Sequence, residues 1–306
     1  MINYVFRRIV YGFLALVGVS IITFLMIFAA GDPVLLLLPP GSHSPEELAI
    51  ARAALGLDRP LPVQYLEFAS RALQGDFGRS LRYSIPSLQL VMERLPYTIV
   101  LASTAVIIAS AIGIPLGVLA ALRKGSKLDD TVVALTSIGL AAPSFFIGTM
   151  LILIFSVNLG WFPPSGTGSW KNLVLPAITL AAAPLPVFVR FTRAGMIDVL
   201  SREYMTTARS KGLHPNTVLY RHALRNTMLP VVTIFGLELA ALLGGAVVTE
   251  NVFGWPGVGQ LVVQSVTNRD LPVVLTCVLV SSFIFIVANL IVDVLYVYIN
   301  PQIRVQ

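Results

Sequence analysis

The chain has 306 residues, of which 56% are apolar and only 12% are charged. Soluble domains carry about 25% charged residues, so this composition and the mean hydropathy of +0.83 exclude an ordinary soluble protein and indicate a chain embedded in lipid. The net charge of +6 is explained by basic loops at a membrane surface and not by a nucleic-acid partner. The single cysteine, Cys277, excludes an intramolecular disulfide.

Six hydrophobic stretches are of a length that can cross a bilayer as helices. Their runs are too continuous for the alternating strands of a barrel, and open sheets cannot span lipid. The predicted spans are residues 9–30, 97–122, 131–157, 173–193, 227–249 and 271–295. The fold class is therefore an all-α integral membrane protein with six transmembrane helices.

The segment between the first two spans, residues 31–96, has helix signals of its own. Ser44 followed by Pro45 opens one predicted helix, which stops at Gly56. A second helical pattern runs from Pro62 to Leu73, and a third covers residues 86–94. We expect a small ordered cap outside the membrane, which either packs over the bundle or docks an outside partner.

The fourth span holds Pro176, Pro184 and Pro186, which leave backbone carbonyls without a helical partner. These prolines predict a kink in the helix, and the kink could serve as a gate.

Basic residues near the span ends set the orientation, because cytoplasmic loops are enriched in Lys and Arg. With the N-terminus inside, the cytoplasm receives Arg7, Arg8, the loop 123–127, Arg190, Arg193 and Arg304. The short outside loops then hold only Lys171 and Arg269, so both termini are predicted to lie in the cytoplasm.

Residues 200–226 form a basic stretch between the fourth and fifth spans. Glu203 suits the first turn of a helix, Arg209 and Lys211 suit its last turn, and Gly212 supplies the stop. Pro215 then opens a second helix that runs toward Asn226. These two helices either rest on anionic lipid or plug into a cytoplasmic partner, and the residues alone do not decide between the two.

Further motifs run through the whole chain in a fixed order. They are Gly31-Asp32-Pro33, Leu55-Gly56-Leu57-Asp58-Arg59-Pro60, Gly75-Asp76-Phe77-Gly78-Arg79-Ser80, Glu203-Tyr204 through Ala208-Arg209-Ser210-Lys211-Gly212, Arg225-Asn226, Leu229-Pro230-Val231-Val232, Glu250-Asn251-Val252-Phe253, Trp255-Pro256-Gly257-Val258-Gly259, and Asn300-Pro301 with Ile303-Arg304. Together they resemble the first (B-type) permease of the dipeptide, oligopeptide and nickel import family of ABC transporters.

This resemblance implies an ABC importer permease fold in the bacterial inner membrane. The chain would form half of a translocation pore for di- and oligopeptides, with nickel complexes or glutathione as alternative cargoes. The implied partners are a second homologous permease, two ABC ATPases that bind ATP and Mg²⁺, and a periplasmic or lipid-anchored substrate-binding protein. The implied ATPase-coupling residues are Glu203, Tyr204, Ala208, Arg209, Lys211, Gly212 and Leu213.

The chain itself shows no sign of catalysis or of a bound cofactor. It lacks the phosphate-binding pattern G-x-x-x-x-G-K-[ST]. His43, His214 and His222 are divided between the two sides of the membrane and form no ligand set, so no metal is expected. We therefore expect that the chain is not an enzyme by itself and that energy comes from partner ATPases.

Three polar residues within or near the spans are substrate-pathway candidates: Glu238, Asn289 and Asp293. A charge at mid-span costs about 3 kcal/mol unless it faces water or a partner, so Glu238 lines the pathway or forms a buried structural pair. Asp293 lies near the inner end of the last span, where a structural role is favoured, and Asn289 lies one turn before it. A secondary transporter is a lower-ranked alternative, because it needs a coupling-ion site and usually an internal repeat.

Overall fold

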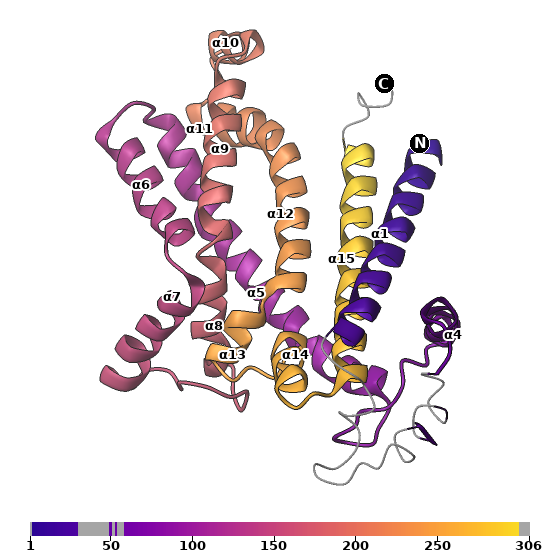
Figure 1. Cartoon of the computed structure of the whole chain (residues 1–306). Helices are drawn as coiled ribbons and strands as arrows, with labels where there is room; N and C mark the ends of the chain where they lie inside the picture. The colour runs from indigo at the N-terminus through magenta and orange to yellow at the C-terminus, as the bar shows by residue number, and fades with distance from the viewer. Residues whose placement is uncertain (1, 30–48, 51–52, 54–57, 300–306) are drawn as a thin grey trace.

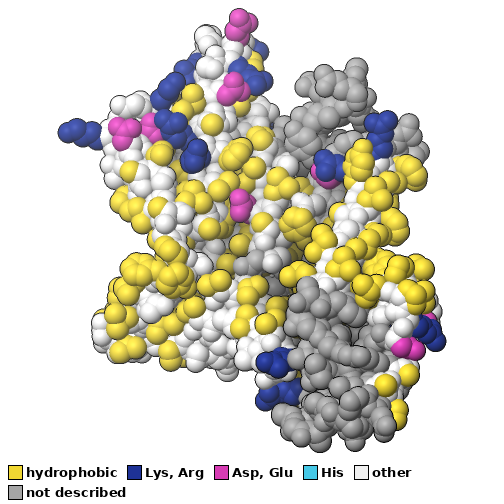
Figure 2. Space-filling view, in the orientation of Figure 1, with side chains coloured by type: hydrophobic (Ala, Val, Ile, Leu, Met, Phe, Trp, Pro, Cys, Tyr) yellow, Lys and Arg dark blue, Asp and Glu magenta, His cyan; other side chains and the backbone are white. Residues whose placement is uncertain are grey.

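The computed structural model describes residues 2–29, 49–50, 53 and 58–299. The helix predicted between Ser44 and Gly56 falls almost entirely outside these ranges. Within them the chain is helical, and its β-structure consists of one isolated bridge between Arg79 and Pro86. Hydrophobic side chains cover the middle of the face seen in Figure 2, and most charged side chains lie toward its two ends. This distribution is that of an integral membrane protein.

The helices follow one another with few long connections (Figure 1). They are α1 (Ile2–Ala29), α4 (Leu61–Leu73), α5 (Ser87–Leu122), α6 (Lys127–Ala141), α7 (Ser144–Leu151), η1 (Ile152–Asn158), α8 (Lys171–Ala181), α9 (Pro184–Leu200), α10 (Glu203–Ser210), α11 (Pro215–Thr217), η2 (Val218–Leu224), α12 (Arg225–Gly245), α13 (Val247–Val252), α14 (Val258–Thr267) and α15 (Leu271–Ile299).

Three helical stretches, within α1, α5 and α15, are each long and apolar enough to cross a membrane on their own. Three bent pairs pass the same test: α6 with α7–η1 (101°), α8 with α9 (55°), and Pro215–Met228 with Pro230–Gly244 (47°). The described chain therefore has three candidate spans, or up to six if each bent pair is one span.

Proline marks each of the three bends. Pro143 follows Ala142, whose extended backbone (φ −86°, ψ 133°) ends α6, because a residue before proline is driven out of the helical region. Pro184 occupies the first turn of α9, as the predicted kink in the fourth span requires, and Pro230 lies inside α12. The structure thus divides the predicted span 131–157 into two helices that meet at a sharp angle.

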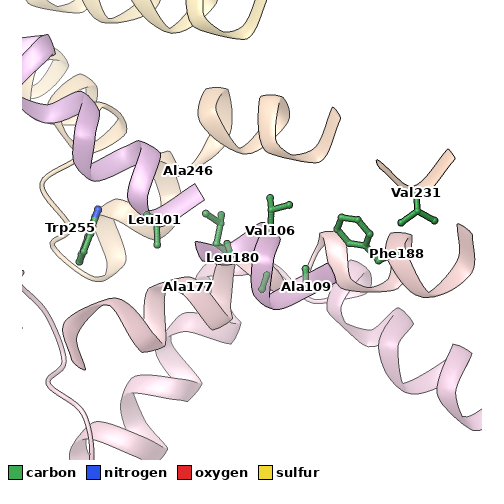
Figure 3. Packing of buried hydrophobic residues seen from close by; sticks show 11 residues of the cluster. Leu101, Val106, Ala109, Ala177, Leu180, Phe188, Val231, Ala246 and Trp255 are labelled. Carbon is green, nitrogen blue, oxygen red and sulfur yellow. The ribbon is translucent and has the colours of Figure 1, made fainter. Parts of the chain in front are cut away.

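The main core lies where α5 crosses α8, α9 and α12 (Figure 3). Phe188 on α9 is fully buried there. A Cβ on Gly113 would lie 2.7 Å from Phe188 Cβ, and one on Gly117 would lie 2.7 Å from the Val189 carbonyl oxygen. The two glycines therefore let α5 and α9 approach closely.

The two ends of the bundle differ in structure (Figure 1). The beginning of α1, the α5–α6 connection, α10 and the end of α15 lie at one end, and α4, α13 and α14 lie at the other. The helix predicted over Pro62–Leu73 is confirmed as α4, which contacts α1 through a hydrogen bond between Tyr65 Oη and Ser20 Oγ (2.8 Å). The third predicted cap helix is the beginning of α5, which starts at Ser87.

Candidate functional site

The predicted coupling segment, residues 200–226, begins with α10. This helix begins after Arg202, whose backbone is extended, and carries Glu203 in its first turn. It ends at Lys211 and Gly212, and Gly212 has a φ of +69°, a left-handed conformation that favours glycine. The helix and the glycine stop predicted from the sequence are both confirmed.

The inner face of α10 is packed into the bundle. Met205 is fully buried and Ala208 is 8% exposed. They belong to one apolar cluster with Ala121 on α5, Met196 and Val199 on α9, and Val218 and Ala223 on η2. Ala208 thus faces the protein's own core and not the free surface. Because α10 is held on three other elements, a force on α10 reaches the bundle directly.

The outer face of α10 and the following turn is free. Glu203, Arg209, Lys211 and Gly212 are exposed, and a Cβ added to Gly212 would meet no atom within 4 Å. Two of the predicted coupling residues have large apolar side chains that are also exposed: the exposed fraction is 40% for Tyr204 and 39% for Leu213. Tyr204 Oη accepts a hydrogen bond from Asn226 Nδ2 (3.1 Å), which fixes the tyrosine ring against η2–α12.

The second helix of the coupling segment does not stop near Asn226. The segments α11, η2 and α12 follow one another without an intervening loop, so one helical path runs from Pro215 into the bundle and bends by 47° at Pro230. The side chain of His214 accepts a hydrogen bond from the Asn216 amide (3.3 Å) and caps its beginning. The turn at Gly212 is therefore joined mechanically to α9 through α10 and to α12 through this path.

An ion pair that sequence reasoning missed braces the same end of the molecule. Asp129, in the first turn of α6, accepts hydrogen bonds from Arg193 Nε (2.6 Å) and Nη2 (2.7 Å) on α9. Its carboxylate also accepts from the Gly125 amide (2.9 Å), and its side chain is almost completely buried. Each residue has a local signal in the sequence: Asp129 lies in the first turn of a helix capped by Ser126, and Arg193 belongs to the basic residues predicted on the cytoplasmic side. No local signal indicates that the two side chains pair, because 64 positions separate them.

The three predicted pathway residues are not brought together. Glu238 is half-buried on α12, and among the described residues it has no hydrogen-bond or ion-pair partner. Asn289 donates to the Phe285 carbonyl oxygen on its own helix (2.9 Å). Asp293 pairs with Arg8 on α1 (3.1 Å), which is the structural role favoured for it from its position.

Glu238 also faces away from α15. Gly236 packs so closely on Val292 that a Cβ there would overlap it, and Glu238 lies about 200° further around the helix. A separate cavity of about 440 Å³ opens between α1, α12, α13, α14 and α15. Its lining is mostly apolar and includes Val247, Cys277 and Phe285, and none of the three predicted pathway residues belongs to it.

A buried carboxylate orders the opposite end of the bundle. Glu250 on α13 is fully buried and accepts hydrogen bonds from Thr98 Oγ1 on α5 (2.7 Å) and from the Gln260 amide at the start of α14 (3.0 Å). Thr98 Oγ1 in turn accepts from the Val258 amide (2.9 Å). A Cβ on Gly257 would overlap the carboxylate. Burial raises the pKa of Glu250, and its hydrogen bonds oppose that rise.

Metal ligands do not gather anywhere in the part of the chain that the structure describes, since no group of three or more His, Cys, Asp or Glu residues could hold an ion there. Two of the described ion pairs, Asp129 with Arg193 and Arg8 with Asp293, instead join different helices.

Comparisons with known proteins agree with this description. The family described as "Binding-protein-dependent transport system inner membrane component" matches residues 113–305, and its N-terminal region family matches residues 1–102. The chain is 42% identical over 99% of its length to an oligopeptide transport system permease of Bacillus subtilis, covering 100% of that protein. It is 43% identical, over 99% of both chains, to a glutathione transport system permease of Salmonella choleraesuis.

A structural likeness supports the fold. The inward-facing methionine ABC transporter MetNI contains a chain that matches with a TM-score of 0.58 at 19% identity, over 69% of this chain and 97% of that one. At this identity the likeness concerns the fold alone. The family match and the two relatives carry the assignment further: the chain belongs to the family of binding-protein-dependent transport system inner membrane components and is a membrane permease.

Proposed function

We propose that this chain forms half of the translocation pore of an ATP-driven importer for di- and oligopeptides. A second, homologous permease would form the other half, and two ATPase subunits would bind ATP and Mg²⁺ at the cytoplasmic face. The observation that carries this proposal is the geometry of α10. Its inner face is buried among α5, α9 and η2, while the turn at Gly212 stands free at the end of the bundle.

The proposed coupling residues fall into two groups. Glu203, Tyr204, Arg209, Lys211, Gly212 and Leu213 are exposed and would touch the ATPases. Ala208 is buried and would set the distance between α10 and the bundle. When the ATPases close on ATP, α10 would move with them and carry α9 and α12 along. Binding drives such a change only through its different affinity for the two states.

The proposed orientation places the α10 end in the cytoplasm. That end also carries the beginning of α1, with Arg7 and Arg8, and the basic loop before α6. Because Lys and Arg accumulate in cytoplasmic loops, one orientation satisfies all of these segments together. The opposite end, with α4, α13 and α14, would then face the periplasm and the substrate-binding protein.

Peptides are the proposed cargo because the relatives named above carry oligopeptides and glutathione, and glutathione is itself a short peptide. Glutathione itself or nickel complexes are the alternative cargoes within the same importer class. Within the chain, Glu238 is the strongest pathway candidate because it is a half-buried carboxylate with no polar partner among the described residues. Asn289 and Asp293 are weaker candidates, since each already has a bond within the chain.

Co-purification tests the proposal. Tagged protein is extracted from its native membrane in mild detergent, beside Gly212→Trp and the control Gly160→Trp. Both glycines have positive φ (69° and 63°) and open surroundings, but they lie at opposite ends of the bundle. We expect two ATPases and a second permease with wild type and with Gly160→Trp, and loss of the ATPases with Gly212→Trp. Recovery of the wild-type chain without ATPases would favour a secondary transporter.

A further inference from the structure

Two loops at the end opposite α10 are locked together by one buried carboxylate. Asp270 is 2% exposed. Its Oδ2 accepts a hydrogen bond from Ser80 Oγ (2.5 Å), and its Oδ1 accepts one from the Leu81 amide (3.1 Å). Ser80 Oγ also accepts from the Tyr83 amide (3.0 Å). The loop before α5 is thereby fixed to the loop before α15, although 190 positions separate them.

The backbone of these two loops is held in an uncommon conformation. Ser84 and Arg269 both have a φ of 57°, and they are the only non-glycine residues with positive φ in the described part of the chain. Such residues persist where the surrounding structure determines the conformation, and they gather at functional surfaces. Here the surrounding structure is the network around Asp270, which sets the direction of the exposed side chains on either side.

The surface presented by this network is basic and partly apolar. Arg82 donates to Asn268 Oδ1 (2.5 Å), and its guanidinium carbon lies 5.9 Å from the centroid of the Tyr83 ring. Arg269 is exposed on the adjoining loop. Leu81 and Tyr83 are 43% and 49% exposed. We call these four residues, Leu81, Arg82, Tyr83 and Arg269, the outer basic patch.

The charge of this patch is not neutralised within the described chain. Among the described residues, neither Arg82 nor Arg269 forms an ion pair, and both oxygens of Asp270 are occupied by Ser80 and Leu81. Figure 2 shows Lys or Arg side chains at this end, below the hydrophobic middle of the molecule. Arginine and tyrosine on a fixed backbone are the residues that dominate binding energy at protein interfaces.

We propose that the outer basic patch is a docking surface for an acidic surface of the substrate-binding protein. The proposal rests on the proposed function, which places this end outside the membrane. A protein partner is favoured over anionic lipid because attraction to lipid headgroups needs no fixed geometry. The patch instead combines two arginines with an aromatic and an aliphatic side chain on loops that a buried carboxylate holds in place.

The test uses the intact transporter, purified with its partner subunits and placed in nanodiscs of neutral lipid. Binding of the separately purified cognate substrate-binding protein is measured by surface plasmon resonance at several salt concentrations. The variants are Arg82→Glu, Arg269→Glu and their combination. Lys171→Glu is the control, because Lys171 is a basic, exposed residue at the start of α8 that lies outside the patch.

We expect the combined variant to weaken binding by about tenfold or more and to flatten its salt dependence, while Lys171→Glu binds like wild type. Arg269→Gly removes the charge and keeps the loop conformation, because glycine readily adopts the positive φ of this position. This variant should also weaken binding of the substrate-binding protein, which would show that the charge and not a disturbed backbone is responsible. Unchanged binding by the combined variant in a complex that retains its ATPases would overturn the docking proposal and leave the proposed function intact. Unchanged binding with loss of co-purifying anionic lipid would instead assign the patch to lipid.

Discussion

The buried Glu250 offers a demanding test of how the outer end of the bundle is built. In Glu250→Ala, Thr98 Oγ1 and the amides of Gly259 and Gln260 lose their acceptor. A buried donor left without a partner costs about 1–3 kcal/mol, so three of them cost about 3 kcal/mol even at the low end of that range. The start of α14 should loosen as a result, because the carboxylate holds it against α5.

Thermal unfolding of the detergent-purified protein measures this cost. In long chains a loss of 1 kcal/mol lowers the unfolding midpoint by about 2 °C, so Glu250→Ala should unfold about 6 °C below wild type. Asn251→Ala is the matched control, because Asn251 is exposed and its side chain bonds only to the Val247 carbonyl of its own helix. A midpoint for Glu250→Ala within about 1 °C of the control would refute the reasoning.

Three further predictions concern charge, packing and orientation. Burial raises the pKa of Glu250 above its ordinary value of 4.5, so the stability that its protonated form contributes is present below pH 4.5 and is lost as pH rises through the folded-state pKa. Over that pH range the unfolding midpoint of wild type should therefore fall relative to that of Glu250→Gln. A midpoint difference that does not change with pH would contradict this prediction. Gly117→Val should destabilise the protein by about 1–3 kcal/mol, because the valine side chain would overlap Thr192 and the Val189 carbonyl oxygen on α9. In fluorescence-detected size exclusion this variant should lose its monodisperse peak. The control Gly18→Val should elute like wild type, because a Cβ at Gly18 has no neighbour within 4 Å. In a Cys277→Ala background, an impermeant maleimide should label Thr167→Cys in intact spheroplasts and Arg209→Cys only after permeabilisation, and the reverse pattern would invert the orientation.

Local signals predicted the elements whose cause is local. The helix over Pro62–Leu73 and the stop at Gly212 depend on periodicity and on one residue with positive φ, and both are confirmed. The close packing of α5 also has a local signal, because Gly113 and Gly117 lie four positions apart on one helical face, although the sequence does not name α9 as the partner. Each of these features is caused by residues close together in the sequence, so it can be predicted without knowing which other segment packs against it.

Features that join distant segments could not be predicted from one sequence. The pairs Thr98–Glu250 and Ser80–Asp270 are 152 and 190 positions apart, and nothing in either residue's neighbourhood identifies its partner. The 101° bend between α6 and α7 had a local cause in Pro143, but the uncharged run around it concealed the break. The continuation of the second coupling helix into α12 was missed because Asn226 marks no helix end when its side chain bonds to its own helix.

Site-specific photocrosslinking at the tip of the coupling segment tests the central claim most directly. A photoreactive phenylalanine analogue is placed at Leu213, which is 39% exposed beside Gly212, and at the control position Trp170, which is 72% exposed at the other end. The proposed function predicts an ATP-sensitive crosslink from position 213 to an ATPase subunit and none from position 170. Crosslinks from position 213 to lipid alone, in membranes where the ATPases are present, would contradict the assignment of this segment as the ATPase contact.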